Sequence, residues 1–177
     1  MTTGILLAGG RSSRMGRDKA LLAWRGKPLI EHMHDVLVAA GARQVVVSGN
    51  RPVWGGVPDD VPDLGPVGGI ASAAAALPDG DVLIVPVDMP RLRPGTLKAL
   101  AEYAPCASFS GHPLPMCLRL DERSRAALHQ LIATPGHECS VAALMNLLDG
   151  VRVTLDGVDT RELVNCNTPA EWLEVQP

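Results

Sequence analysis

Aromatic residues are scarce in this 177-residue sequence, which contains one Tyr, one Phe and three Trp. Proteins that hold a single strand of nucleic acid stack successive bases on aromatic side chains. The formal net charge of -3 also argues against a broad basic face, because affinity for a phosphate backbone comes mainly from clustered Lys and Arg. We therefore expect no nucleic acid among the partners of this chain.

Long apolar runs are absent as well, and none approaches the roughly 20 residues that a membrane-spanning helix needs. The first residues, Met1-Thr2-Thr3-Gly4, lead directly into an apolar strand, without the basic and apolar regions of a signal peptide. We expect a cytoplasmic protein with no membrane partner.

Cysteine spacing is not that of a metal site or of a disulfide framework. No C-x-x-C pair occurs among the four cysteines, which are Cys106, Cys117, Cys139 and Cys166. We expect ordinary buried or half-buried thiols.

The composition, 46% hydrophobic and 20% charged, is typical of a globular protein, and we expect one domain over residues 1–177. Short apolar runs alternate with segments of helical periodicity. Strands are expected at 5–8, 45–47, 82–87 and 151–155, and helices at 28–41, 67–77, 96–104, 121–132 and 141–148. Because these strands are continuously apolar, we predict an α/β fold, a three-layer Rossmann-like sandwich with a mostly parallel sheet covered on both faces.

Two segments of the second half carry distinct signals. Residues 109–120 contain strand-like pieces that we expect to be interrupted by Pro113 and Pro115, because proline cannot donate to a β-ladder. Residues 168–171 have the form of a capping box with proline at the first helical position, which predicts the start of a last helix.

A glycine-rich, basic loop follows the first expected strand over residues 9–19, Gly-Gly-Arg-Ser-Ser-Arg-Met-Gly-Arg-Asp-Lys. Glycines let backbone N–H groups approach an anion, and Arg11, Arg14 and Lys19 supply positive charge, so this loop predicts a phosphate cradle. It is not a Walker A loop, because two residues separate Gly16 from Lys19, nor does it contain the G-x-G-x-x-G of a dinucleotide fold. A glycine-rich surface turn with solvated basic residues is the alternative.

Other candidate segments follow later strands, and the carboxyl ends of parallel strands gather ligands at one edge of a sheet. Residues 48–51 offer small and polar groups for a base or sugar, and residues 59–69 form a Pro- and Gly-rich loop that opens a helix. Asp88 ends an apolar strand, where a carboxylate suits Mg²⁺ bound with phosphates. Asn165 and Asn167 could add neutral oxygen ligands. Plain turns and caps remain alternative readings of each segment.

Five motifs together resemble the molybdenum cofactor guanylyltransferases, and the match spans nearly the whole chain in order. They are Leu-Ala-Gly-Gly-Arg-Ser-Ser-Arg-Met-Gly-Arg-Asp-Lys at 7–19, Gly-Lys-Pro-Leu at 26–29, Gly-Pro-Val-Gly-Gly at 65–69, Val-Asp-Met-Pro at 87–90 and Asn-Cys-Asn-Thr-Pro at 165–169. The first motif is shared with many nucleotidyltransferases of the glycosyltransferase-A-like fold. The Gly-Gly doublet, the Gly-Pro-Val-Gly-Gly loop and the terminal Asn-x-Asn-Thr-Pro favour guanylyl transfer.

This resemblance implies transfer of GMP from GTP to the terminal phosphate of molybdenum-molybdopterin, with release of pyrophosphate. It implies further partners among cofactor-biosynthesis proteins and apo-molybdoenzymes. Arg14, Lys19 and Asp88 would be catalytic, and Mg²⁺ would be held by Asp88 together with Asn165 and Asn167. The implied nucleotide-binding residues are Leu7, Ala8, Gly9, Gly10, Lys19, Ser48, Asp59 (or the adjacent Asp60), Gly68 and Asp88. Ser48 stands where the family usually has asparagine.

Two other functions stay open at this point. A cytidylyltransferase or a sugar-1-phosphate nucleotidyltransferase would use the same fold, since base specificity depends on a few loop residues. A non-catalytic GTP-binding or cofactor-chaperone module would keep the glycine loop but lose the metal carboxylate, so Asp88 speaks against it. In the catalytic reading the acceptor phosphate attacks in line, and neither a protein nucleophile nor a dedicated general base is required.

Overall fold

The elements alternate between strands and helices for most of the chain, in a computed structural model that describes residues 2–9, 18–133 and 139–176. The first half contains β1 (Thr2–Leu7), η1 (Lys19–Leu21), β2 (Ala23–Trp24), β3 (Lys27–Pro28), α1 (Leu29–Ala39), β4 (Gln44–Ser48), η2 (Pro52–Trp54), α2 (Gly65–Ala75) and β5 (Gly80–Pro86). The second half contains α3 (Pro94–Ala101), β6 (Cys106–Phe109), β7 (His112–Leu120), α4 (Glu122–Ala133), α5 (Val141–Leu147), β8 (Val151–Val153), η3 (Thr160–Leu163) and α6 (Pro169–Val175).

Six of the strands form one sheet in the order β4-β1-β5-β7-β6-β8, and β7 alone among them runs antiparallel to its neighbours. The mostly parallel α/β fold expected from the sequence is therefore confirmed. Since β4, β1 and β5 are mutually parallel, their carboxyl ends meet at the same edge of the sheet.

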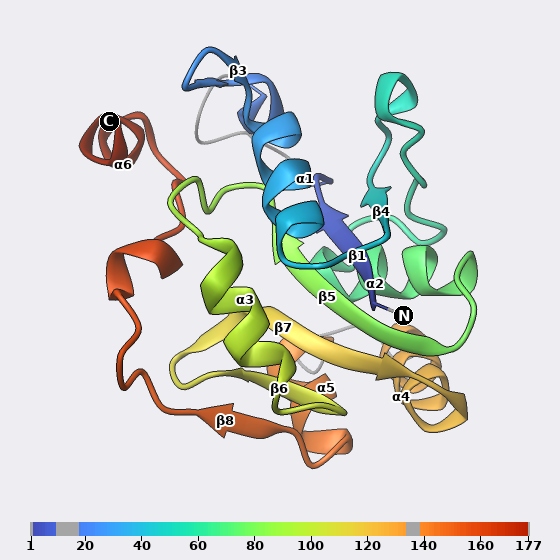
Figure 1. Cartoon of the computed structure of the whole chain (residues 1–177). Coiled ribbons are helices and arrows are strands. Elements are labelled where there is room, and N and C mark those ends of the chain that lie inside the picture. Colours follow the sequence, from blue (N-terminus) through green and yellow to red (C-terminus); the bar gives the residue numbers. More distant parts are fainter. Residues whose placement is uncertain (1, 10–17, 134–138, 177) are drawn as a thin grey trace.

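Helices cover both faces of this sheet (Figure 1). One apolar core lies between the sheet and α1 and α3, and a second lies between the opposite face and α2, α4 and α5. Successive residues of β5 alternate between the two cores: Leu83 and Val85 pack into the first, and Val82 and Ile84 into the second. Side chains on both faces of such a strand are buried, which explains its continuous apolar run.

The predicted helices and strands are all present, with ends that differ by a few residues, but the expectation for 109–120 was wrong. One strand, β7, continues through Pro113 and Pro115. Ser108 and Phe109 are neighbours on β6, but their partners on β7 are Met116 and His112. Both prolines therefore lie in an irregular stretch of the pairing, where the ladder needs no backbone N–H from them. The expected capping box is confirmed at Thr168 and Glu171.

The cysteines are free thiols, as expected, with three buried and Cys139 half-buried. Burial raises the pKa of Cys106 and of Cys166 to about 11, so both are protonated at neutral pH. No helix in the described part of the chain has the length and apolar character to cross a membrane.

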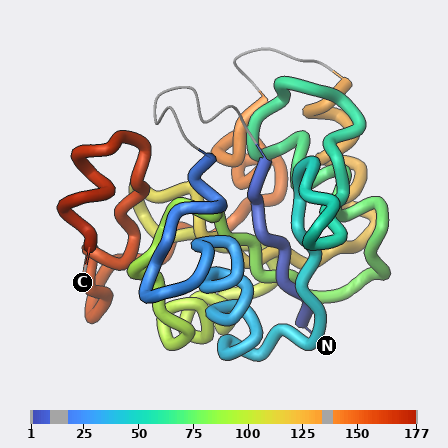
Figure 2. The backbone as a smooth tube through the Cα atoms, turned by 90° about the horizontal axis from the view of Figure 1, so that it is seen from above, coloured from blue at the N-terminus to red at the C-terminus, as the bar shows by residue number. Residues whose placement is uncertain are grey.

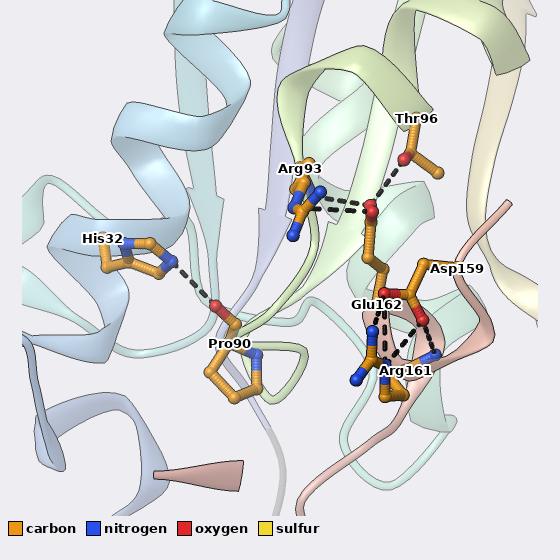
Figure 3. A network of polar contacts seen from close by, with 7 residues as sticks. All are labelled: His32, Pro90, Arg93, Thr96, Asp159, Arg161 and Glu162. Carbon is orange, nitrogen blue, oxygen red and sulfur yellow. Dashed lines mark hydrogen bonds and ion pairs between the residues drawn. The ribbon is translucent and has the colours of Figure 1, made fainter. Parts of the chain in front are cut away.

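The C-terminal segment returns to the first part of the chain. Figure 2 shows this segment, in red, beside the blue stretch that precedes α1, and Trp172 packs on Trp24 with ring centroids 5.7 Å apart. Glu162, only 6% exposed, accepts hydrogen bonds from the Thr96 hydroxyl and from the Arg93 backbone N–H, the latter at 3.2 Å. Figure 3 shows these groups converging at the start of α3. Glu162 thus anchors the segment that leads to Asn165.

Replacing Glu162 by Ala tests this anchor. The change removes two hydrogen bonds to a buried charged acceptor, and we expect the free energy of unfolding to fall by about 1.5–3 kcal/mol in urea titrations. Glu174→Ala, at an exposed position of α6, is the matched control and should stay within roughly 0.5 kcal/mol of wild type. Equal stability of the two variants would contradict the anchoring role.

Candidate functional site

A pocket of about 730 Å³ opens at the edge of the sheet where β4, β1 and β5 end. Its walls come from the residues that follow these strands, from the loop before α2, from Leu114 on β7 and from the C-terminal segment. Eight of the residues predicted from the sequence line it: Leu7, Ala8, Gly9, Lys19, Ser48, Asp59, Asp88 and Asn165. The structure therefore brings these separate segments together in one cavity.

Lys19 and Asp88 form the charged centre of this pocket. The ammonium of Lys19 lies 3.1 Å from Asp88 Oδ2 and donates to Asn167 Oδ1 at 2.6 Å. Asn165 Nδ2 donates to Asp88 Oδ1 at 2.8 Å. The side chains of Lys19 and Asp88 are only 16% and 14% exposed, so their charges face the cavity rather than bulk water.

A backbone hydrogen bond places the C-terminal amides in this centre. The Cys166 N–H donates to the Asp88 carbonyl oxygen at 2.8 Å, which holds the segment that carries Asn165 and Asn167 against Asp88. The turn after Asp88 is held from α1, where His32 Nε2 lies 2.9 Å from the Pro90 carbonyl oxygen (Figure 3). Burial lowers the pKa of His32, so at neutral pH it makes this contact as an uncharged donor.

The donor set around Asp88 fits Mg²⁺ only when the ion arrives with phosphates. The described residues contain no cluster of three or more His, Cys, Asp or Glu side chains able to hold a metal ion. One carboxylate and nearby amide oxygens match what Mg²⁺ takes from a protein when phosphate oxygens and waters complete its octahedron. Asn167 Oδ1 accepts from Lys19, whereas Asn165 contacts Asp88 through Nδ2. Of the two amides, Asn165 is therefore the one better placed to offer its oxygen beside Asp88.

A second corner of the pocket is built around Asp59. Its Oδ1 atom is buried and has no hydrogen-bond partner among the residues that the structure describes. Burial raises the pKa of Asp59, the Ser48 hydroxyl opposes that shift, and the charge of Asp60 adds to it. A Cβ atom at Gly69 would lie 2.5 Å from Ser48 Oγ. Because glycine has no Cβ, helix α2 can lie this close to Ser48. A carboxylate oxygen left without a donor is positioned to accept from a ligand.

The remaining predicted residues fall elsewhere. Gly68 does not line the pocket: a Cβ there would meet Leu64 Cβ at 2.8 Å, and the residue borders a smaller cavity between α2 and α4. Its neighbour Gly69 lines the pocket instead. Asp60 borders the same smaller cavity, so Asp59 is the carboxylate that faces the pocket. Gly10 and Arg14 lie outside the described residues.

Asp18 and Arg51 also line the pocket; both lie in segments predicted as candidates, 9–19 and 48–51, but neither was named as a site residue. Arg51 donates to both carboxylate oxygens of Asp18 and, through Nε, to the Ala8 carbonyl oxygen at 3.0 Å. An acid directly before Lys19 and a base four residues after an expected strand were the available signals. Nothing local in the sequence connects these two positions.

Comparisons with known proteins show the family of this chain. The family model of the MobA-like NTP transferase domain matches residues 4–150. A molybdenum cofactor guanylyltransferase from Xanthomonas euvesicatoria is 51% identical over 174 residues, covering 96% of this chain and 92% of that protein. The chain belongs to the MobA-like NTP transferase family.

Solved structures share the fold of this family member. A nucleotidyl transferase from Methanothermobacter superposes with a TM-score of 0.73 at 20% identity, over 99% of this chain and 96% of that one. Molybdopterin-guanine dinucleotide biosynthesis protein A from Archaeoglobus fulgidus gives a TM-score of 0.72 at 20% identity, over 98% and 96% of the two chains. At that level of identity the likeness establishes the architecture alone.

The raised pKa of Asp59 predicts a pH-dependent cost to stability. Because the folded protein holds this proton more tightly than the unfolded chain, the contribution of Asp59 favours folding at low pH and is lost as pH rises from about 4 through the raised value. Asp59→Asn removes this dependence, so the stability of the variant relative to wild type should increase between pH 4 and 7 in urea titrations. Asp156→Asn, at an exposed carboxylate, is the control. A difference between Asp59→Asn and wild type that is constant with pH would contradict the assignment.

Proposed function

We propose that this chain transfers GMP from GTP to the terminal phosphate of molybdenum-molybdopterin, giving the guanine dinucleotide cofactor and pyrophosphate. The observation that carries the proposal is the Lys19–Asp88 pair, 3.1 Å apart at the carboxyl edge of the sheet in a member of the MobA-like family. Its curated relative carries the name of that activity and matches nearly the whole chain. The substrates are therefore GTP and molybdenum-molybdopterin.

The two corners of the pocket suggest how GTP lies in it. The triphosphate belongs beside Lys19, whose ammonium supplies the positive charge, and the base belongs beside Asp59 and Ser48. Guanine offers adjacent N–H donors on its Watson–Crick edge, whereas cytosine offers an amino group next to acceptors. An acceptor-only carboxylate with an unpartnered oxygen matches guanine better. Asp59 is thus the candidate for base selection.

The chemistry asked of the protein is positioning and neutralisation of charge. The acceptor is a phosphate that already carries negative charge at neutral pH, so it can attack the α-phosphate in line without a dedicated base. Lys19 would neutralise charge that grows on the α-phosphate and on the leaving pyrophosphate. Arg14 remains a candidate for the same role. No covalent intermediate with the protein is needed.

Magnesium dependence is part of the proposal. Asp88 would hold Mg²⁺ with Asn165 beside it, and the phosphates and waters would supply the other ligands. When bound, the ion supplies Lewis-acid stabilisation of the phosphate oxygens. The contribution of the chain is to pair Asp88 with Lys19 and to fix the direction of its carboxylate through Asn165.

Nucleotide preference tests the proposed substrate. A site built around Asp59 leaves polar groups unpaired with the wrong base, at about 1–3 kcal/mol for each loss. We expect GTP to bind at least ~10-fold more tightly than CTP or ATP in titration calorimetry at fixed Mg²⁺. GTP should also be the nucleotide that releases pyrophosphate with molybdopterin as acceptor. Equal affinity for CTP would favour the cytidylyltransferase alternative.

Replacing Asp88 tests the catalytic centre. Asp88→Asn keeps the shape of the side chain but removes its charge, and we expect turnover to fall at least ~10-fold, about 1.4 kcal/mol of barrier. Asp81→Asn is the matched control, because Asp81 lies near the start of β5, at the end opposite to Asp88, and pairs with Arg119 on the surface. Wild-type turnover by folded Asp88→Asn at limiting Mg²⁺ would refute the role of Asp88.

A further inference from the structure

Arg51 makes three hydrogen bonds that connect two strand ends and the start of η1. Its Nε donates to the Ala8 carbonyl oxygen at 3.0 Å, and its two terminal nitrogens donate to the two carboxylate oxygens of Asp18, one of them at 2.8 Å. The side chain of Arg51 is 16% exposed and that of Asp18 33%. Ala8 and Asp18 flank residues 9–17, so one guanidinium ties together both sides of that segment.

The backbone that carries Arg51 is fixed independently of this contact. The Gly49 N–H donates to the Val57 carbonyl oxygen at 2.7 Å, and the Gly56 N–H donates to the Arg51 carbonyl oxygen at 2.9 Å. These two bonds close residues 49–57 into a loop. Gly49 has a φ of +119°, and a Cβ there would lie 2.7 Å from Gly9 N. Because the two backbones touch, the segment after β4 forms a rigid support for the one after β1.

Asp18 connects Arg51 to the turn that carries Lys19. Its Oδ1 accepts from Ala20 N–H at 3.1 Å and caps η1, the turn that begins at Lys19. Arg51 holds the same carboxylate by a two-point contact, and it lowers the pKa of Asp18. The direction of the capping carboxylate, and with it the start of the Lys19 turn, is therefore set by Arg51.

We propose that Arg51 is a positioning residue for nucleotidyl transfer, which acts through Asp18 to hold the Lys19 ammonium at the reacting phosphates. The inference rests on the proposed function, because it assigns Arg51 to the same reaction. It differs from a purely structural role, because a residue that only stabilised the fold would lower the melting temperature without lowering kcat of the folded protein. A shift of about 1 Å in a reacting group can lower the rate roughly 100-fold.

The chemistry of arginine makes a specific demand at this position. Lysine carries the same charge but is a point donor, and it cannot make a planar two-point contact with Asp18 while also reaching Ala8. Arg51→Lys should therefore fold normally and still lose turnover. If Arg51 contributed only charge to the pocket, lysine would restore most of the rate.

The test measures kcat and KM for pyrophosphate release in Arg51→Ala, Arg51→Lys and Arg119→Ala, with melting temperatures for each. Arg119 makes the matched contact, with 2.8 Å and 3.2 Å bonds to Asp81 on the surface between β5 and β7. We expect both Arg51 variants to lower kcat about 10-fold or more with a smaller change in KM. Arg119→Ala should keep kcat within about twofold of wild type.

Double variants show whether Arg51 acts through its neighbours. Adding Arg51→Ala to Asp18→Asn or to Lys19→Ala should cost less than about twofold more in kcat, because the chain of contacts is already broken. Full additivity in both backgrounds would overturn the inference, and so would wild-type kcat in folded Arg51→Lys. Turnover is measured with whichever nucleotide the wild type uses, so a preference for CTP refutes the proposed substrate alone. A wild type that uses no nucleotide overturns both proposals.

Discussion

The ion pair between Lys19 and Asp88 is the contact on which the pocket depends. It joins the segment after β1 to the end of β5, and Asn165 and Asn167 from the end of the chain complete it. Two opposite charges that are largely removed from water are stable there only because each is paired and hydrogen-bonded. In the proposed function a triphosphate and its cation would bring the same two charges to this place, so the residues that stabilise the pocket are also those suited to bind the substrate.

The fold holds this pair in place through its two cores. Helices α1 and α3 pack on one face of the sheet and α2, α4 and α5 on the other, which fixes the strand ends from which the pocket is built. The site itself departs from this well-satisfied interior. Asp59 keeps a buried oxygen that no group in the described ranges contacts by a hydrogen bond, and Gly49 adopts a backbone conformation that other residues rarely take. Such departures concentrate where a ligand is to be received, because a ligand can satisfy what the protein alone leaves open.

Much of the local structure followed from the chain alone. The apolar runs in β1, β4 and β5, the periodicity of α1 and α4, and the capping box of α6 depend on near neighbours, and these elements were predicted correctly. So was the gathering of Lys19, Ser48, Asp59 and Asp88, because parallel strands place their carboxyl ends at one edge. The uninterrupted course of β7 was not foreseen, since tolerance of Pro113 and Pro115 depends on the irregular pairing with β6.

The sequence by itself determined most of the helices and strands, the burial of both sheet faces and the family to which the chain belongs, because these depend on periodicity and on motifs that can be read along the chain. Only the tertiary structure decided which partners meet across the pocket. Arg51 and Asp18 are 33 residues apart, and Lys19 and Asn167 are 148 apart. It also decided that Gly69 rather than Gly68 lines the cavity. Successive residues of a helix point in directions about 100° apart around its axis, so neighbouring positions face different surroundings. These pairings depend on strand order, register and helix rotation, which arise from packing of the whole chain.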